Sequence, residues 1–368
     1  MPCEQASEWP RHGGQAGALL ERFGLPADHP FEDFSANLNP LGPPGWVPAW
    51  LARHVGELAR YPDVNYAEPR AAIAAHHGVM PGQVLLANGG GEAIFLAAGL
   101  CAGGRAGVLA PTFNEYARAL AGVGAEVREI SLADSLEDLD AVFLCRPNNP
   151  DGGLLALADV DALLARAAAC GCRVVVDEAF IDMTARPADA AALPTRLAAH
   201  PNLILLRSMT KFYTLPGLRL GYALASEALI AAMARRQPPW SVNRLAAGLV
   251  APLLADTAFS ERTRAWLAAE RPRMHRALQA LGLEVAPGET CFFLLCPGVE
   301  LRRRGITAEA LLERLLCGGI LVRHTHGYKG LDGRWLRLAL RDADANDRLL
   351  KGLGDALKGE EDRRGRLR

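Results

Sequence analysis

The sequence predicts an α/β protein in which a large domain with a mostly parallel sheet is followed by a smaller α+β domain. Short apolar runs alternate with helical stretches between residues 84 and 225, and this alternation is typical of βα units that build a parallel sheet. After residue 283 the pattern becomes one of strand-length apolar segments with few helices between them, which is typical of an antiparallel α+β layer. A chain of 368 residues is long enough for two such units.

The large domain is expected to contain strands that end where polar or turn residues begin. Apolar composition predicts strands at Ala106–Ala110, Ala125–Ile130, Ala141–Cys145, Val174–Asp177 and Leu220–Ala225, and a strand, glycine turn and helix over Val84–Leu100. Helical composition predicts helices at Val47–Leu58, Ala67–His77, Ala158–Ala169 and Arg244–Leu254. Such continuous apolar strands are expected in a sheet that is buried on both faces.

The chain is expected to divide into four segments. Residues 1–45 form an N-terminal arm that packs with the small domain and the active site, residues 46–260 the large domain, residues 261–358 the small domain, and residues 359–368 a charged, disordered tail. Small-domain strands are predicted near residues 283–287, 291–296, 320–323 and 334–341, with helices at Thr307–Leu316 and Ala343–Leu357. The arginine-rich run Ala265–Ala280 is expected to present a solvated helix face.

Composition predicts a small-molecule ligand. Lys and Arg number 40 against 41 Asp and Glu, so the net charge of −1 suggests neither a nucleic-acid nor a membrane partner. The eight cysteines contain no C-x-x-C pair and are expected to be buried thiols. No secretory leader is recognisable, and no apolar run reaches the ~18 residues of a membrane span. A cytoplasmic location is therefore expected.

Two histidine pairs could suggest a metal site. His76 and His77 are neighbours in a helical pattern, where their side chains point about 100° apart, and His324 and His326 are the second pair. Neither pair has carboxylates or thiols at the spacing of metal ligands. No metal site is predicted.

One lysine is flanked by residues that suit a phosphate. Ser208, Lys211 and Arg219 all lie in the segment Leu206–Tyr222. An amine that is to form a Schiff base must lose its proton near neutral pH, which apolar surroundings or a neighbouring cation bring about. Hydroxyls and a guanidinium suit the phosphate of a cofactor beside it. An exposed loop lysine is the alternative.

Upstream turns offer further polar groups at strand ends. Asp177 follows an apolar strand, and Asn149 lies in an Asn-Pro turn after another. Gly90 and Gly91 precede a helix whose start could hold a phosphate. A dinucleotide motif on Gly89 would need glycine at Ile94, and no Gly-Lys-Ser/Thr of a P-loop follows.

Four motifs in this order resemble the fold-type-I pyridoxal-phosphate enzymes of the aminotransferase family. They are Asn-Pro-x-Gly at residues 149–152, Asp-Glu-Ala at 177–179, Ser-x-x-Lys at 208–211 and Pro-Gly-x-Arg-x-Gly at 216–221. The resemblance extends from about residue 10 to residue 341 and implies the cofactor pyridoxal 5′-phosphate. It implies that Lys211 carries the cofactor, that Asp177 lies beneath the ring nitrogen, and that Asn149 contacts the ring hydroxyl oxygen.

The resemblance implies further cofactor contacts. Tyr116 would stack on the pyridine ring, and Tyr61 would reach the cofactor phosphate of the other subunit in a homodimer. The expected phosphate-binding residues within the subunit are Gly90, Gly91, Ser208 and Arg219. Many relatives carry a tyrosine three residues after the aspartate, whereas this chain has Phe180, as threonine-phosphate decarboxylases do.

The substrate contacts that the resemblance implies are those of threonine-phosphate decarboxylases. Arg337 would bind the α-carboxylate as a bidentate pair, and Arg323 the substrate phosphate. The other expected contacts are His12 and Gly13 at the phosphate, and Asn37 and Asn149 over the substrate. The implied reaction is decarboxylation of O-phospho-L-threonine to (R)-1-aminopropan-2-yl phosphate for cobalamin biosynthesis.

Two other functions stay open. An aminotransferase acting on histidinol phosphate or a related phosphorylated amine is the runner-up, since sequence does not reveal which bond at the substrate Cα is turned out of the ring plane. A non-catalytic relative is the third, although Lys211 and Asp177 are intact. Asp151 and Cys291 depart from the family's usual threonine and asparagine, which affects turn packing and substrate detail.

Overall fold

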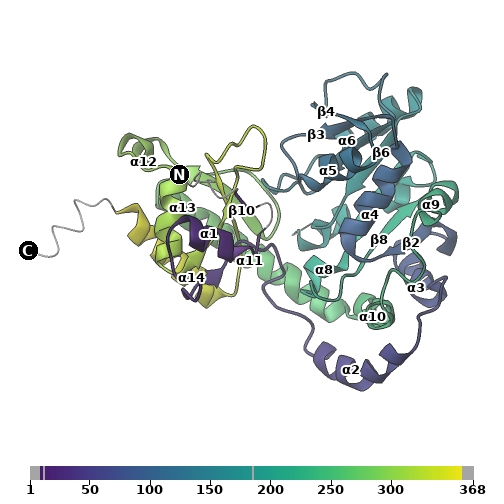
Figure 1. The fold of residues 1–368 in the computed structure, drawn as a ribbon, viewed down its shortest axis with the longest axis horizontal. Coiled ribbons are helices and arrows are strands. Elements are labelled where there is room, and N and C mark those ends of the chain that lie inside the picture. Colours follow the sequence, from purple (N-terminus) through teal and green to yellow (C-terminus); the bar gives the residue numbers. More distant parts are fainter. Residues whose placement is uncertain (1–8, 11–12, 185, 359–368) are drawn as a thin grey trace, which may run out of the picture.

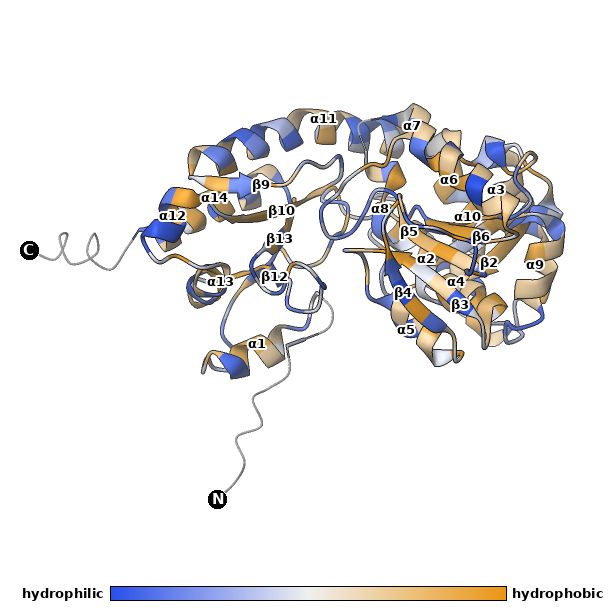
Figure 2. Ribbon diagram, turned by 90° about the horizontal axis from the view of Figure 1, so that it is seen from above, coloured by the Kyte–Doolittle hydropathy of each residue, from blue (hydrophilic) through white to orange (hydrophobic). Residues whose placement is uncertain are grey.

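The computed structural model describes residues 9–10, 13–184 and 186–358. Within these ranges the chain forms two lobes joined by a long helix, α11 (Thr257–Ala280) (Figures 1 and 2). The predicted boundary between residues 260 and 261 falls inside this helix, and the division into four segments stays a prediction. His12 and the predicted tail lie outside the described residues.

The first lobe is built on a seven-stranded sheet with the order β2-β8-β7-β6-β5-β3-β4. Strand β8 is antiparallel to both of its neighbours, and the other pairs are parallel. The strands are β2 (Val84–Ala87), β3 (Arg105–Leu109), β4 (Glu126–Ile130), β5 (Ala141–Cys145), β6 (Arg173–Asp177), β7 (Leu203–Ser208) and β8 (Gly221–Ala225). The predicted mostly parallel sheet is confirmed.

Helices cover both faces of this sheet, which is why its central strands are apolar throughout. Alternate residues of one strand join different cores: Val174 and Val176 lie in one, and Val175 in the other. The helices of the first lobe are α2 (Val47–His54), α3 (Ala67–His77), α4 (Gly89–Ala98), α5 (Glu115–Gly122), α6 (Leu157–Ala169), α7 (Pro187–Ala192), α8 (Met209–Phe212), α9 (Glu227–Ala234) and α10 (Arg244–Ala255). α4, α5 and α9 pack on one face, and α3, α6 and α10 on the other.

The second lobe holds an antiparallel sheet with the order β12-β13-β10-β9. Its strands are β9 (Leu283–Val285), β10 (Phe292–Pro297), β12 (Arg323–His324) and β13 (Leu336–Ala339), and its helices are α12 (Val299–Arg303), α13 (Ala308–Cys317) and α14 (Ala343–Leu357). Helix α11 buries a stripe that includes Leu267, Met274 and Leu278 and leaves its other face polar, as predicted.

The N-terminal segment packs on the second lobe. Helix α1 (Ala16–Arg22) places Leu19 and Leu20 against Leu316 and Leu321. Strand β1 (Glu32–Asp33) pairs in parallel with β11 (Ile320–Leu321). The predicted strand at residues 320–323 is thus split, because the chain leaves β11 and enters β12 of the other sheet.

Two predicted helix ends differ from the structure by more than one residue. The helix after β2 begins at Gly89 and not at Glu92, so the predicted glycine turn is its first turn. The helix from Val47 ends at His54 and continues as a 3₁₀ helix, Val55–Ala59.

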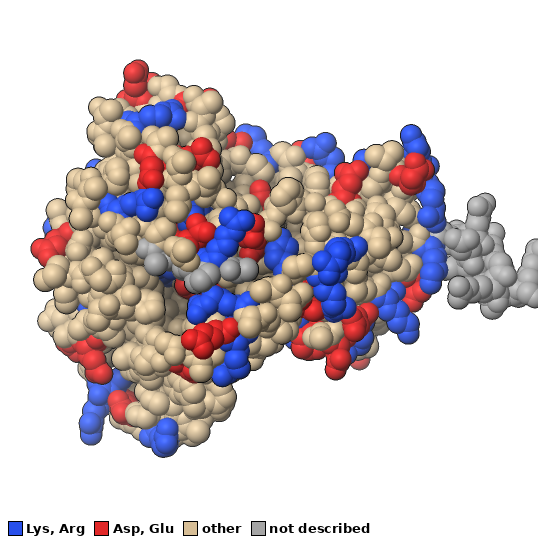
Figure 3. Space-filling model, turned by 180° about the vertical axis from the view of Figure 1, so that it is seen from behind, with Lys and Arg blue, Asp and Glu red and all other residues tan. Residues whose placement is uncertain are grey.

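None of the helices in the described ranges is both long and apolar enough to cross a membrane. Charges of both signs are interspersed on the face in Figure 3.

Candidate active site

A cavity of about 340 Å³ lies at the carboxyl ends of β5, β6 and β7, where the second lobe and the N-terminal segment meet the large sheet. It gathers twelve of the residues predicted from the sequence: Gly13, Asn37, Gly90, Gly91, Tyr116, Asn149, Asp177, Ser208, Lys211, Arg219, Arg323 and Arg337. Tyr61 is not among the lining residues, and its side chain is 77% exposed. The cavity occupies the site that parallel sheets generally use for ligands.

The carboxylate of Asp177 is buried and held in place. Strand β6 ends at this residue, whose Oδ2 accepts a hydrogen bond from the Tyr116 hydroxyl at 2.8 Å and whose Oδ1 accepts one from the Ala179 N–H at 2.9 Å. Burial raises the pKa of Asp177, whereas these hydrogen bonds and Lys211 act in the opposite direction. A buried, oriented acid of this kind suits a cationic or protonated partner.

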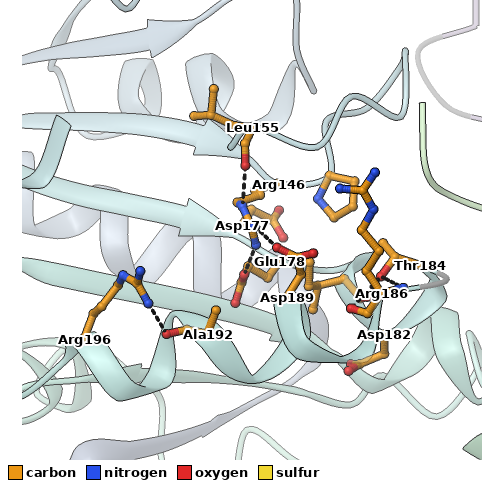
Figure 4. A network of polar contacts seen from close by, with 12 residues as sticks. Arg146, Leu155, Asp177, Glu178, Asp182, Thr184, Arg186, Asp189, Ala192 and Arg196 are labelled. Atoms are coloured by element: carbon orange, nitrogen blue, oxygen red, sulfur yellow. Dashed lines mark hydrogen bonds and ion pairs between the residues drawn. The ribbon is translucent and has the colours of Figure 1, made fainter. Parts of the chain in front are cut away.

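Glu178, the next residue, points to the opposite face of the sheet and has a structural role. Its carboxylate contacts Arg146 at 3.3 Å and Arg207 at 2.9 Å, and Arg146 also contacts Asp189 at 2.7 Å (Figure 4). Arg146, Glu178 and Arg207 are each at most 2% exposed. Removing one partner of a buried ion pair typically lowers the free energy of unfolding by about 3–5 kcal/mol. This network therefore fixes the strand ends that carry Asp177 and Ser208.

The amine of Lys211 is buried beside other cations. Lys211 lies in the short helix α8, directly after β7. Burial lowers the pKa of its amine to about 8, with further lowering by Arg337 and Arg219. A larger fraction of this amine is therefore uncharged near neutral pH than for an ordinary lysine, whose pKa is about 10.4.

The start of α4 forms a cradle with Ser208 and Arg219. Gly89 has φ +78°, and a Cβ there would lie 2.5 Å from the Arg219 guanidinium. A Cβ at Gly221 would lie 2.8 Å from the backbone of Gly89 and Gly90. Arg219 itself has φ +58°, a strained conformation for a residue with a side chain. The free N–H groups of a helix start, a hydroxyl and a guanidinium together suit a phosphate.

Two arginines of the second lobe face the same cavity. Arg323 in β12 and Arg337 in β13 are direct partners across the strand pair, and they are 3% and 5% exposed. Arg337 donates from Nη1 to Asn149 Oδ1 at 2.5 Å and from Nη2 to the Ser35 carbonyl at 2.8 Å. Like charges opposite each other destabilise a sheet, so this pair favours an anionic ligand.

Buried polar atoms without hydrogen-bond partners also indicate that this cavity binds a ligand. Within the described residues, Arg337 Nε and both amide atoms of Asn37 are buried and make no hydrogen bond. Such atoms are rare in folded proteins and usually have a ligand or a water as partner. Asn37 and Arg337 both line the cavity.

Several lining residues were missed by the sequence analysis. Tyr328 lies in a glycine-rich loop of the second lobe, and Phe113 and Glu115 flank the start of α5. Phe180 lines the cavity too and packs its ring against Phe292, with 5.1 Å between centroids. Tyr328, Phe113 and Glu115 belong to none of the four motifs, which is why only the fold brings them to the site.

The two residues that depart from the family pattern are Asp151 and Cys291. Asp151 Oδ1 accepts a hydrogen bond from the Gly153 N–H at 2.8 Å, which stabilises the turn. Cys291 is fully buried, with its Sγ 3.6 Å from Met183 Sδ.

In the part of the chain that the structure describes, no group of three or more His, Cys, Asp or Glu side chains could hold a metal ion.

Comparison with known proteins agrees with this site. The family described as aminotransferase class I and II matches residues 31–353. The chain belongs to this family. It is 40% identical over 363 residues to the threonine-phosphate decarboxylase of Salmonella typhimurium, covering 95% of this chain and 97% of that protein. It is 32% identical to a histidinol-phosphate aminotransferase of Ralstonia nicotianae, covering 94% and 93%.

Solved structures of the family have the same fold. L-threonine-O-3-phosphate decarboxylase from Porphyromonas gingivalis matches with a TM-score of 0.77 and 27% identity, over 89% of this chain and 99% of that one. Histidinol-phosphate aminotransferase from Sinorhizobium meliloti in complex with pyridoxal-5′-phosphate matches with a TM-score of 0.81 and 24% identity, over 95% of both chains. The predicted fold-type-I class is confirmed.

Proposed function

We propose that the chain is a pyridoxal-phosphate-dependent decarboxylase that converts O-phospho-L-threonine into (R)-1-aminopropan-2-yl phosphate and CO₂, for cobalamin biosynthesis. The observation that carries the proposal is the composition of one cavity, which holds Lys211 and Asp177 at the large sheet and two buried arginines opposite. The 40% identity to a threonine-phosphate decarboxylase over nearly the whole chain supports this substrate over histidinol phosphate.

The residues present fit pyridoxal 5′-phosphate. The cradle of Gly90, Gly91, Ser208 and Arg219 would hold its phosphate, and a Cβ at Gly89 would fill that cradle. When bound, the cofactor supplies a sink for the electrons of the bond that breaks at the substrate Cα. The buried carboxylate of Asp177 would keep the ring nitrogen protonated.

Two arginines are assigned to the two anionic ends of the substrate. Arg337 would bind the α-carboxylate, because its Nε lacks a partner among the described residues and a guanidinium binds carboxylates in a bidentate manner. Arg323, with the nearby backbone of Gly13, would bind the phosphate. The amide of Asn37, whose Nδ2 and Oδ1 are buried without partners among the described residues, would form hydrogen bonds with the substrate.

Lys211 has two tasks that follow from its environment. Its neutral amine would attach the cofactor, and its Nζ would later deliver a proton to the Cα from which CO₂ has left. Both tasks need an amine that gains and loses a proton near neutral pH, which a pKa of about 8 provides.

The test is turnover without an acceptor. Purified protein with O-phospho-L-threonine and pyridoxal 5′-phosphate is expected to release CO₂ and form aminopropanol phosphate in equal amounts, in the absence of any keto acid. An aminotransferase would instead need 2-oxoglutarate and would convert histidinol phosphate into a carbonyl product. Turnover of histidinol phosphate alone would replace the proposal by the aminotransferase function.

The pH dependence of cofactor attachment follows from the pKa of Lys211. The neutral amine is the nucleophile, so attachment should speed up as pH rises through about 8 and level off above it. Attached cofactor can be trapped by borohydride and counted by peptide mass spectrometry. An attachment rate that keeps rising beyond about pH 10, as for an ordinary lysine, would contradict the assigned environment.

A homodimer is part of the proposal. Apolar side chains that are 44–77% exposed gather around the segment that carries Tyr61: Val55, Leu58, Tyr61, Val64 and Trp240. The rings of Tyr61 and Trp240 lie 4.7 Å apart and line one surface groove. Exposed apolar patches of this kind are typical of interfaces, and a second copy of the chain would place Tyr61 at the other subunit's cofactor phosphate.

Mixed dimers test whether Tyr61 acts across the interface. Tyr61→Ala and Lys211→Ala chains, each nearly inactive alone, are expected to regain activity when coexpressed. In a mixed dimer, the site with an intact Lys211 then receives an intact Tyr61 from the partner chain, so roughly half of the sites are restored. Coexpression that restores nothing, although mixed dimers form, would place Tyr61 in the site of its own chain or outside both.

The division into an arm, two domains and a tail, with its boundaries after residues 45, 260 and 358, also belongs to the proposal. So does the cytoplasmic location. It is supported by the cysteines of the described ranges, which are all unpaired, as is usual in a reducing compartment.

A further inference from the structure

The loop between β12 and β13, residues 325–335, brings a tyrosine into the cavity. Tyr328 is 4% exposed, lines the cavity and packs its ring against Leu294 and Leu331. Thr325 Oγ1 donates to the Trp335 carbonyl at 2.7 Å and so closes the base of the loop. The position of the Tyr328 hydroxyl is therefore fixed by packing on both sides.

This hydroxyl contacts one of the two arginines that face the cavity and interacts electrostatically with the other. Tyr328 Oη accepts from Arg337 Nη1 at 3.3 Å and donates to Asn149 Oδ1 at 3.3 Å. Burial lowers the pKa of Arg323 to about 10, and the electrostatic interaction with Tyr328 partly offsets this. One phenol thus shares the cavity with two guanidiniums that are direct partners across β12 and β13.

The loop is also tied to the first lobe. Asn114 Nδ2 donates to the Gly327 carbonyl, and Lys329 Nζ lies 3.1 Å from Glu129 Oε2. Together with the bond to Asn149, these contacts hold the loop against the sheet that carries Lys211. The distance from the reacting amine to each arginine is therefore set partly through this loop.

We propose that Tyr328 is a specificity-determining residue, which fixes the spacing of Arg323 and Arg337 and so selects substrates with a short backbone between carboxylate and phosphate. The inference rests on the proposed function, because it assigns one anionic group to each arginine. Without the hydroxyl, the two guanidiniums repel each other and separate. A longer phosphorylated amino acid would then fit comparatively better.

The test compares two isomeric ligands, which differ in whether the fourth carbon is a methyl branch, as in O-phospho-L-threonine, or lengthens the chain between carboxylate and phosphate, as in O-phospho-L-homoserine. Binding of O-phospho-L-threonine and O-phospho-L-homoserine is measured by calorimetry on the Lys211→Ala chain without cofactor, where no turnover consumes the ligand. Both ligands carry the same amino and carboxylate groups, so the contribution of these groups to binding cancels in the ratio of the two dissociation constants. Adding Tyr328→Phe is expected to lower the preference for O-phospho-L-threonine roughly 10-fold, the usual effect of one hydrogen bond to a charged group.

A matched control separates the hydroxyl from the loop. Arg334→Ala removes an exposed side chain of the same loop, which among the described residues contacts only Gly330 and Asp332 within that loop, and is expected to leave the ratio unchanged. An equal loss of both ligands in Tyr328→Phe, or no loss of either, would overturn the inference, as would a Lys211→Ala chain that binds neither ligand. Turnover by the unaltered chain decides the proposed function separately.

Discussion

Lys211→Ala is expected to abolish turnover and covalent retention of the cofactor, with activity falling roughly 10⁴-fold or more. The side chain is the buried amine of the cavity, with a pKa lowered to about 8 by burial and by neighbouring arginines. Its loss would remove both the proposed attachment point and the proposed proton donor. The measurement is CO₂ release together with the absorbance of the cofactor after gel filtration.

Two further variants make this result specific. Lys211→Arg keeps a positive charge but cannot attach an aldehyde, so it should be as inactive as alanine. Lys351→Ala removes an exposed lysine of α14 and should behave like the unaltered chain. If Lys211→Ala retains a bound, borohydride-trappable cofactor and normal turnover, another amine carries the cofactor and the assignment is wrong.

Asp177→Asn is expected to lower the decarboxylation rate by about 10²–10³-fold while the protein stays folded. The carboxylate is buried at the end of β6 and accepts hydrogen bonds from Tyr116 and Ala179. An amide oxygen can keep one of these bonds, but the negative charge proposed to keep the cofactor's ring nitrogen protonated would be lost. The loss should appear in kcat, whereas the KM for O-phospho-L-threonine changes little, because Arg323 and Arg337 are intact.

The melting temperature and a surface control accompany this variant. A near-normal Tm would show that the loss is chemical rather than structural. Asp138→Asn removes a carboxylate that is 65% exposed and should leave kcat unchanged. An Asp177→Asn protein with full kcat would show that the buried carboxylate plays no part in the reaction.

Much of the site follows from the sequence because strand ends in a parallel sheet converge. Asn149, Asp177 and Lys211 each follow an apolar strand, and the carboxyl ends of neighbouring parallel strands meet at one edge. The predicted strand ends place Asn149 and Asp177 together, whereas Lys211 joined them only through the family resemblance, because β7 was not predicted as a strand. The same reasoning finds the glycines of α4, although not that the helix begins at Gly89.

The rest depends on long-range packing that local patterns do not encode. Tyr328 reaches Asn149 across 179 positions of the chain, and Arg337 reaches Ser35 across 302. The opposition of Arg323 and Arg337 depends on strand register, which a polar-apolar pattern of two short strands leaves open. Tyr116 was predicted to stack on the cofactor ring, and that role stays a prediction, whereas its hydrogen bond to Asp177 is seen only in the fold.

The central claim is that the bond between Cα and the carboxylate breaks and the Cα–H bond does not. Deuterium labelling tests this claim most directly. In D₂O, conversion of O-phospho-L-threonine is expected to give aminopropanol phosphate with one deuterium on the carbon that lost CO₂. Recovered substrate should carry no deuterium at Cα, because its C–H bond is never broken. Substrate that gains deuterium at Cα, or a keto acid product, would contradict the account and indicate an aminotransferase.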